Sequence, residues 1–109
     1  MTILHSYPAT IIRVIDGDTV RMSVDVGFRM RFEDNFRLAG INAAEGKETD
    51  AAHRLRSLLE PGKEVIAYTT KPEKFGRWMA DVEIPGKTIS VCRLLLEEGH
   101  AVSYSGGKR

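Results

Sequence analysis

Hydrophobic and polar residues alternate along the first forty positions of the chain. Residues 9–15 are rich in β-branched side chains, and in residues 20–26 valine or methionine alternates with a polar residue. Gly27 interrupts this alternation, residues 28–32 resume it with phenylalanine and methionine against arginine, and residues 35–41 continue or restart that strand. A period of two residues is typical of a strand with one buried face. The pattern therefore predicts a three-stranded antiparallel meander.

The second half of the chain has the pattern of two helices and two further strands. Alanine and leucine recur at helical spacing after Thr49, which suits an N-cap, and the EPG segment ends that helix. Residues 63–70 and 78–84 have the composition and alternation of strands. A short helix follows over SVCRLLLEEG with Gly99 as its C-cap, and the tail 103–109 is expected to be irregular.

Five short strands, with one helix between the third and the fourth, favour a partly open β-barrel of the OB type. The expected fold class is thus mainly β with some α (α+β), an OB-fold five-stranded β-barrel with two short helices. A β-sandwich is less favoured, because about seven strands would be expected there. All 109 residues, 1–109, are expected to form one domain.

Composition narrows the classes of partner. The chain has 16 Lys and Arg against 15 Asp and Glu, so its net charge of +1 cannot hold nucleic acid by bulk charge. Cys92 is the one cysteine, which excludes an internal disulfide and a cysteine zinc cluster and suits a small buried residue. No signal peptide or membrane-spanning run is evident, so we expect a cytoplasmic protein of bacterial, bacteriophage or mobile-element origin.

The segment VIDGDTV places Asp16 and Asp18 on either side of Gly17. Asp-Gly between hydrophobic runs is a strong hairpin signal, because Gly tolerates positive φ. Two carboxylates are also suited to a hard cation such as Ca²⁺ or Mg²⁺. The two interpretations are compatible, since a tight turn can hold both carboxylates on one rim.

Three further residues have both an ordinary and a chemical interpretation. Arg37 would point to solvent as a strand residue, Glu45 would be an exposed loop residue, and Arg77 would stack on Trp78. Alternatively, two arginines suit a phosphate, and a carboxylate beside metal and phosphate could orient or deprotonate water. With the acid pair, these residues form a set suited to metal-assisted phosphodiester hydrolysis.

The chain contains, in order, the segments RVIDGDTV, RLAGINAAE, KFGRW and LLLEEGHA. These segments resemble the ordered signatures of the thermonuclease family, the staphylococcal-nuclease-like domain, from about Ala9 to about Tyr104. The resemblance implies an OB-type barrel and a Ca²⁺-dependent nuclease. Its expected substrate is single-stranded or locally melted DNA or RNA, and it is expected to act as a monomer without a membrane partner.

The resemblance also implies a metal site. Asp18 would bind the metal directly, Asp16 would act through water, and the carbonyl of Ala43 would reach the ion. Asn42 stands where the family has a carboxylate ligand, and an amide oxygen brings no charge, so weakened metal binding is expected. Ala44 stands where the family has a proline, which would leave the following loop less restrained.

The remaining roles implied by the resemblance concern the substrate. Arg37 would grip the scissile phosphate, Glu45 would act on the attacking water, and Arg77 would stabilise charge in the transition state. Lys74 and Phe75 match positions that line the nucleotide pocket.

A second hypothesis belongs to another class of function. A noncatalytic OB-type module could keep the fold and bind nucleic acid or a protein partner. Asn42 and the lack of a basic stripe favour this module. The joint presence of two arginines and three acidic residues favours the enzyme: Asp16, Asp18, Arg37, Glu45 and Arg77.

Overall fold

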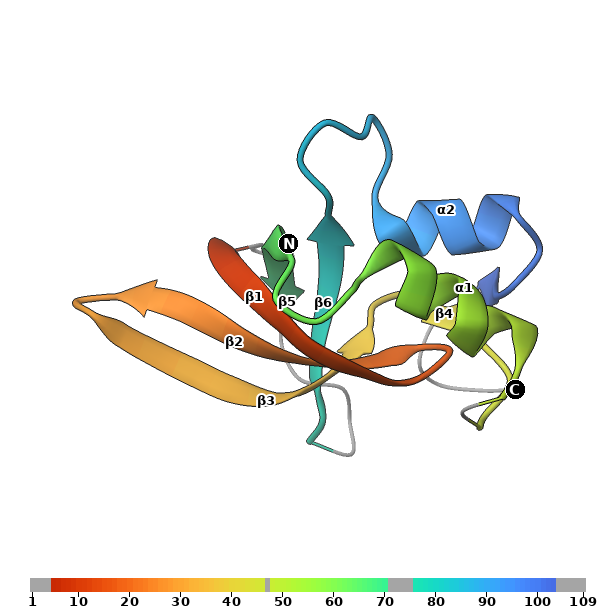
Figure 1. The fold of residues 1–109 in the computed structure, drawn as a ribbon, viewed down its shortest axis with the longest axis horizontal. Coiled ribbons are helices and arrows are strands. Elements are labelled where there is room, and N and C mark those ends of the chain that lie inside the picture. Colours follow the sequence, from red (N-terminus) through yellow and green to blue (C-terminus); the bar gives the residue numbers. More distant parts are fainter. Residues whose placement is uncertain (1–4, 47, 71–75, 104–109) are drawn as a thin grey trace.

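A computed structural model describes residues 5–46, 48–70 and 76–103 (Figure 1). Of the predicted irregular tail, residues 104–109 lie outside this part of the chain, whereas Ser103 belongs to a short strand.

Five strands form a closed barrel in the order β1-β2-β3-β6-β5. They are β1 (His5–Asp16), β2 (Thr19–Gly27), β3 (Met30–Leu38), β5 (Glu64–Thr70) and β6 (Trp78–Glu83). The first three form the predicted antiparallel meander, and β5 pairs antiparallel with both β1 and β6. The barrel is closed rather than partly open, because β3 and β6 pair in parallel over residues 36–38. The predicted mainly β, OB-fold-like class with two helices is confirmed.

The two helices pack on different strands of the barrel. Helix α1 (Asp50–Leu58) contacts β1, and its predicted N-cap is confirmed, since Thr49 Oγ1 accepts the N–H of Ala52 at 3.1 Å. Helix α2 (Val91–Glu97) contacts β6, and its C-cap is Glu98, one residue before the predicted cap Gly99, which has a φ of 81°. Neither described helix has the length and apolar character needed to cross a membrane.

A second, two-stranded sheet lies beside the barrel, and the sequence pattern did not predict it. Strand β4 (Ile41–Asn42) pairs antiparallel with β7 (Val102–Ser103), so Ile41 belongs to this second sheet and not to the third strand, as had been expected (Figure 1). Two residues are too few to display a period, and their partner is about sixty positions away in the chain. The pairing fixes the backbone of Asn42.

The barrel core follows the predicted alternation, but the β2–β3 hairpin extends past it. Val20, Met22 and Val24 are at most 2% exposed, whereas Val26 is 39% exposed. The tip turns through Phe28 and Arg29 with φ of 56° and 61°, the signs required by a two-residue type I′ turn.

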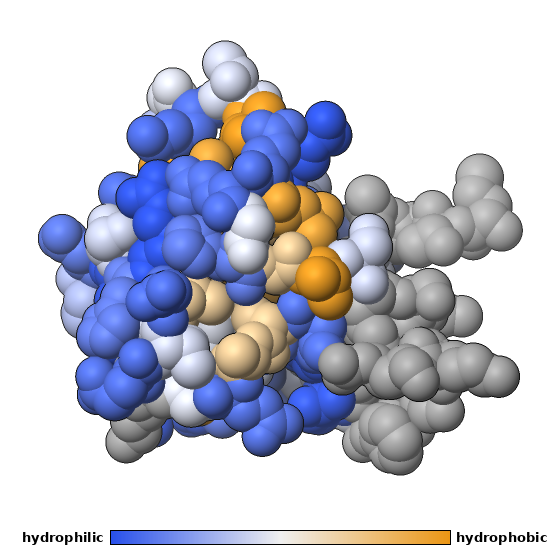
Figure 2. Space-filling model, turned by 90° about the vertical axis from the view of Figure 1, so that its right-hand side faces the viewer, coloured by the Kyte–Doolittle hydropathy of each residue, from blue (hydrophilic) through white to orange (hydrophobic). Residues whose placement is uncertain are grey.

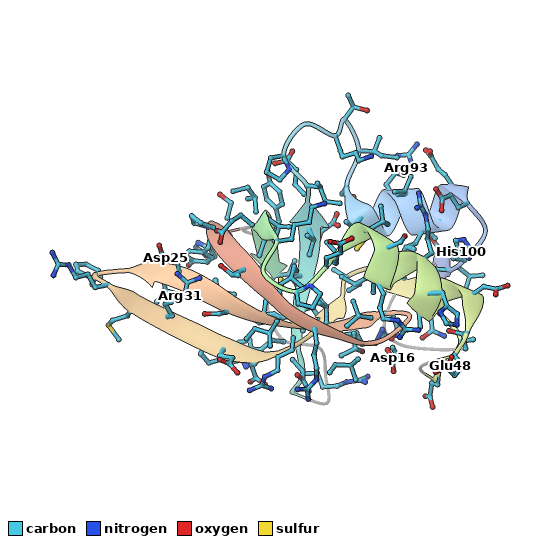
Figure 3. All side chains as sticks on the ribbon, in the orientation of Figure 1. Asp16, Asp25, Arg31, Glu48, Arg93 and His100 are labelled. Carbon is cyan, nitrogen blue, oxygen red and sulfur yellow. The ribbon has the colours of Figure 1, made fainter. Side chains whose placement is uncertain are left out.

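Residues 28–32 therefore do not form the buried face that their alternation suggested. Phe28 is 95% exposed, and β6 joins β3 from Phe36 onward, so among the described residues only β2 pairs with the outer part of β3. Figure 3 places Asp25 and Arg31 on this hairpin, at the opposite end of the molecule from Asp16. The hairpin thus points away from the acid pair.

Candidate functional site

The acid pair lies on a tight turn between β1 and β2, as predicted. Asp16 pairs with Thr19 across the hairpin, and the N–H of Asp18 donates to Asp16 Oδ1 at 3.2 Å. The predicted reason for the glycine is wrong, because Gly17 does not have a positive φ. A Cβ at this position would instead lie 2.7 Å from the Cβ of Ala51. Gly17 is needed because the turn packs directly against the start of α1.

The carboxylate of Asp18 is buried beneath the loop that follows β4. Asp18 is 7% exposed, and its Oδ2 accepts a hydrogen bond from the backbone N–H of Ala43 at 2.9 Å. The hydroxyl of Thr19 donates to Oδ1 at 3.3 Å. Burial raises the pKa of Asp18, while the Ala43 N–H and the charge of Arg37 act in the opposite direction. The turn and the loop after β4 are thus joined through one carboxylate.

Arg37 is buried, so the interpretation that it points to solvent is wrong. It is 6% exposed, its Nη1 lies 3.4 Å from Asp18 Oδ2, and its Nη2 donates to the amide oxygen of Asn42. The strand pairing explains its place, because Arg37 lies opposite Thr19 and the N–H of the next residue donates to the carbonyl of Asp18. The guanidinium is therefore oriented by both the turn and β4.

These side chains share one pocket of about 380 Å³. Its lining residues come from the β1–β2 turn, β3, the β4 segment and the start of β6: Asp16, Asp18, Thr19, Arg37, Asn42, Ala43, Ala44, Glu45 and Arg77. Glu45 and Arg77 are exposed, whereas Asp18 and Arg37 form the buried base. The fold thus brings together three carboxylates and two guanidinium groups that the sequence separates by about sixty positions.

The face of the molecule at the acid-pair end is largely hydrophilic. Figure 3 labels both Asp16 and Glu48, which precedes α1, at this end of the molecule. Figure 2 views the molecule from this side and shows hydrophilic residues around a smaller hydrophobic patch. A polar surface of this kind suits a charged ligand better than a broad apolar partner.

The oxygen atoms that line the pocket are of the type that binds a hard cation. The carboxylates of Asp16 and Asp18 lie on one turn, and carboxylate oxygens are the ligands that Ca²⁺ prefers. Within the described ranges, however, no group of three or more acidic, histidine or cysteine side chains is arranged around a common ion position. The amide oxygen of Asn42 accepts a hydrogen bond from Arg37. A cation here would therefore rely on two carboxylates and on further oxygen ligands such as water.

Sequence reasoning missed Thr19 and a neighbouring pocket. The second pocket, of about 330 Å³, shares Thr19, Arg37 and Arg77 with the first and is also lined by Asp34, Asn35, Gly76 and Trp78. Thr19 directly follows the acid pair in the sequence, and this position was a signal that its hydroxyl could donate to Asp18. Lys74 and Phe75, predicted to line a nucleotide pocket, lie outside the described residues.

Comparison with protein-family models and with curated proteins finds no match for this chain.

Proposed function

We propose that the chain is a Ca²⁺-dependent nuclease that hydrolyses phosphodiester bonds in single-stranded or locally melted DNA or RNA. One observation carries this proposal: a buried arginine, Arg37, is oriented by Asp18 and Asn42 at the base of a pocket that also holds Glu45 and Arg77. Burial of a charged side chain is costly unless it is paired. A barrel that only had to fold could place this strand residue in solvent at no such cost.

The two arginines form the phosphate-binding part of the proposal. A guanidinium presents a fixed fork of donors that matches two phosphate oxygens. Because Asp18 and Asn42 already orient Arg37, little further ordering is needed when a phosphate binds. Arg77 is exposed and lines the same pocket, so it can contact a phosphate bound there.

The carboxylates have two separate roles in the proposal. Asp16, Asp18 and the carbonyl of Ala43 would hold Ca²⁺, which supplies positive charge to the phosphate when bound. Glu45 lines the pocket but is exposed, so it can accept a hydrogen bond from water and orient it or remove its proton. Action as a monomer and a cytoplasmic location are also part of the proposal.

Cleavage of a single-stranded DNA oligonucleotide in Ca²⁺ tests the phosphate-binding role. Arg77→Ala should lower kcat/KM by about 10²- to 10³-fold, because it removes a charged donor that stabilises the phosphate in the transition state. Arg37→Ala should lose at least as much, and Arg37→Lys, which keeps the charge but not the fork, should recover part of it. Arg93→Ala, an exposed arginine on α2 paired with Glu97, is the matched control.

Circular dichroism should show that each variant is folded before its rate is compared. Because Arg77 is exposed, its variant separates a catalytic effect from a folding effect better than the buried Arg37 does. Wild-type activity in folded Arg77→Ala would contradict the proposed clamp.

One observation favours a second candidate, a noncatalytic module that binds nucleic acid or a protein partner. The amide of Asn42 faces Arg37 and brings no negative charge, so the pocket has fewer anionic ligands than a tight Ca²⁺ site uses. Oligonucleotide binding without cleavage at any Ca²⁺ concentration, by folded protein, would favour this candidate.

A further inference from the structure

We infer that the second pocket is a nucleobase subsite beside the scissile phosphate, with Trp78 as its stacking platform. The inference rests on the proposed function and extends it to a substrate contact. It is carried by the shared wall between the two pockets and by the exposure and anchoring of the indole.

The two pockets are contiguous through the residues proposed to bind phosphate. Thr19, Arg37 and Arg77 line both of them. A nucleoside attached to a phosphate held by these arginines therefore has the second pocket of about 330 Å³ next to it. A phosphate alone would occupy the first pocket and leave the second to solvent.

Trp78 has the properties of a stacking platform rather than of a core residue. It is the first residue of β6 and is 40% exposed, although its indole is large and apolar. Its ring meets Phe32 edge to face, with centroids 5.8 Å apart and planes at 86°. Phe32 in turn meets the buried Phe36 edge to face at 6.1 Å. The indole is thus anchored from one side while part of it stays accessible to a base.

Two polar residues that line the second pocket, Asp34 and Asn35, can form hydrogen bonds with a base edge. Arg21, held by Glu33 at 2.9 Å, donates to Asn35 Oδ1 at 3.0 Å and so fixes which way that amide faces. The carboxylate of Asp34 accepts the N–H of Asn35 at 2.7 Å. An oriented amide and a carboxylate offer a donor and an acceptor, the two groups that base edges read.

Trp78 is the one tryptophan in the chain, so all tryptophan fluorescence comes from this subsite. The test compares a short oligothymidylate with an abasic oligonucleotide of equal length. Each strand is titrated into the protein, once in the presence of Ca²⁺ and once in the presence of EDTA. The base-bearing strand should quench the fluorescence, and the abasic strand should not. Anisotropy of fluorescein-labelled strands should show that the base-bearing strand binds more tightly.

Substitution should then remove the advantage of the base. Trp78→Ala should weaken binding of the oligothymidylate by about 5- to 150-fold, the range for loss of one stacked base, and leave the abasic strand unaffected. Trp78→Phe should restore part of the loss. Phe28→Ala is the matched control, since Phe28 is 95% exposed but lines neither pocket.

The outcomes separate this subsite from the proposed function. Equal quenching by both strands, or a Trp78→Ala variant that binds both like the wild type, would overturn the subsite even if the protein cleaves DNA. If neither strand binds and no cleavage occurs, the subsite and the proposed function both fail.

Discussion

Replacement of Gly17 by alanine tests the contact that holds the acid pair against α1. The added Cβ would lie 2.7 Å from the Cβ of Ala51, 3.1 Å from that of Ala43 and 3.4 Å from the carbonyl oxygen of Ala44. Carbon atoms pack best at about 3.5–4.0 Å, so the closest overlap is roughly 1 Å. Because two of the three contacts are with Cβ atoms and one is with backbone, no flexible side chain can move away.

The expected loss of stability follows from these distances. Overpacking of this kind costs about 1–3 kcal/mol. Gly17 does not need a positive φ, so alanine also restricts the unfolded chain and recovers roughly 0.4–1 kcal/mol. The net destabilisation should be about 1–2 kcal/mol, which for a domain of this size lowers Tm by roughly 4–8 °C.

Urea denaturation, followed by circular dichroism, measures this loss. A double variant, Gly17→Ala with Ala51→Gly, removes the closest contact. The cost of the double variant should be smaller than the sum of the single costs by about 1 kcal/mol or more. A Gly17→Ala variant as stable as the wild type, or strict additivity in the double variant, would refute the close-approach argument.

Three further predictions concern single side chains. Glu45→Gln should lower kcat by about 10²-fold with little change in KM, because it removes a general base. Glu48→Gln, at an exposed glutamate, is its control. Wild-type turnover by Glu45→Gln would contradict the role of Glu45 in water activation. Burial, together with Asp81, raises the pKa of the Cys92 thiol. A maleimide should therefore label Cys92 slowly in the native protein and rapidly only in denaturant, where the chain is unfolded. Rapid labelling of the native protein would contradict the burial of Cys92. The hydrogen bonds that Arg54 donates lower the pKa of Glu98 in the folded protein. The Glu98 carboxylate therefore stabilises the fold at pH values above its unfolded-state pKa of 4.5, and this stabilisation is lost as the pH falls through its folded-state pKa. The Tm of Glu98→Gln should therefore lie below that of the wild type at neutral pH and meet it in acid, and equal Tm values at neutral pH would contradict this coupling.

The barrel was predictable because its signals are local. The alternation of Val20, Met22 and Val24 identifies a strand with one buried face, and these residues are buried. The outer part of the same hairpin was not predictable, because exposure there depends on where β6 joins β3. The pattern of Phe28 and its neighbours shows a strand but does not show whether another strand covers it.

The members of the site were predictable, but their contacts were not. Residue type and pattern identified Asp18 and Arg37, motif resemblance added Asn42, and the structure places all three around one pocket. The burial of Arg37 depends on the turn and on β4, which pairs with a segment about sixty positions away. No local pattern could show that Asn42 would accept a hydrogen bond from Arg37.

The most direct test of the proposed nuclease is cleavage of single-stranded DNA across a Ca²⁺ titration, with the wild type compared with Asn42→Asp. The substituted carboxylate can still accept the hydrogen bond from Arg37, so the pocket should stay intact while one negative charge is added. We predict cleavage that requires Ca²⁺, with a lower half-saturating Ca²⁺ concentration in the variant. Absence of cleavage in both proteins, each shown to be folded, would contradict the assignment of this pocket as a nuclease site.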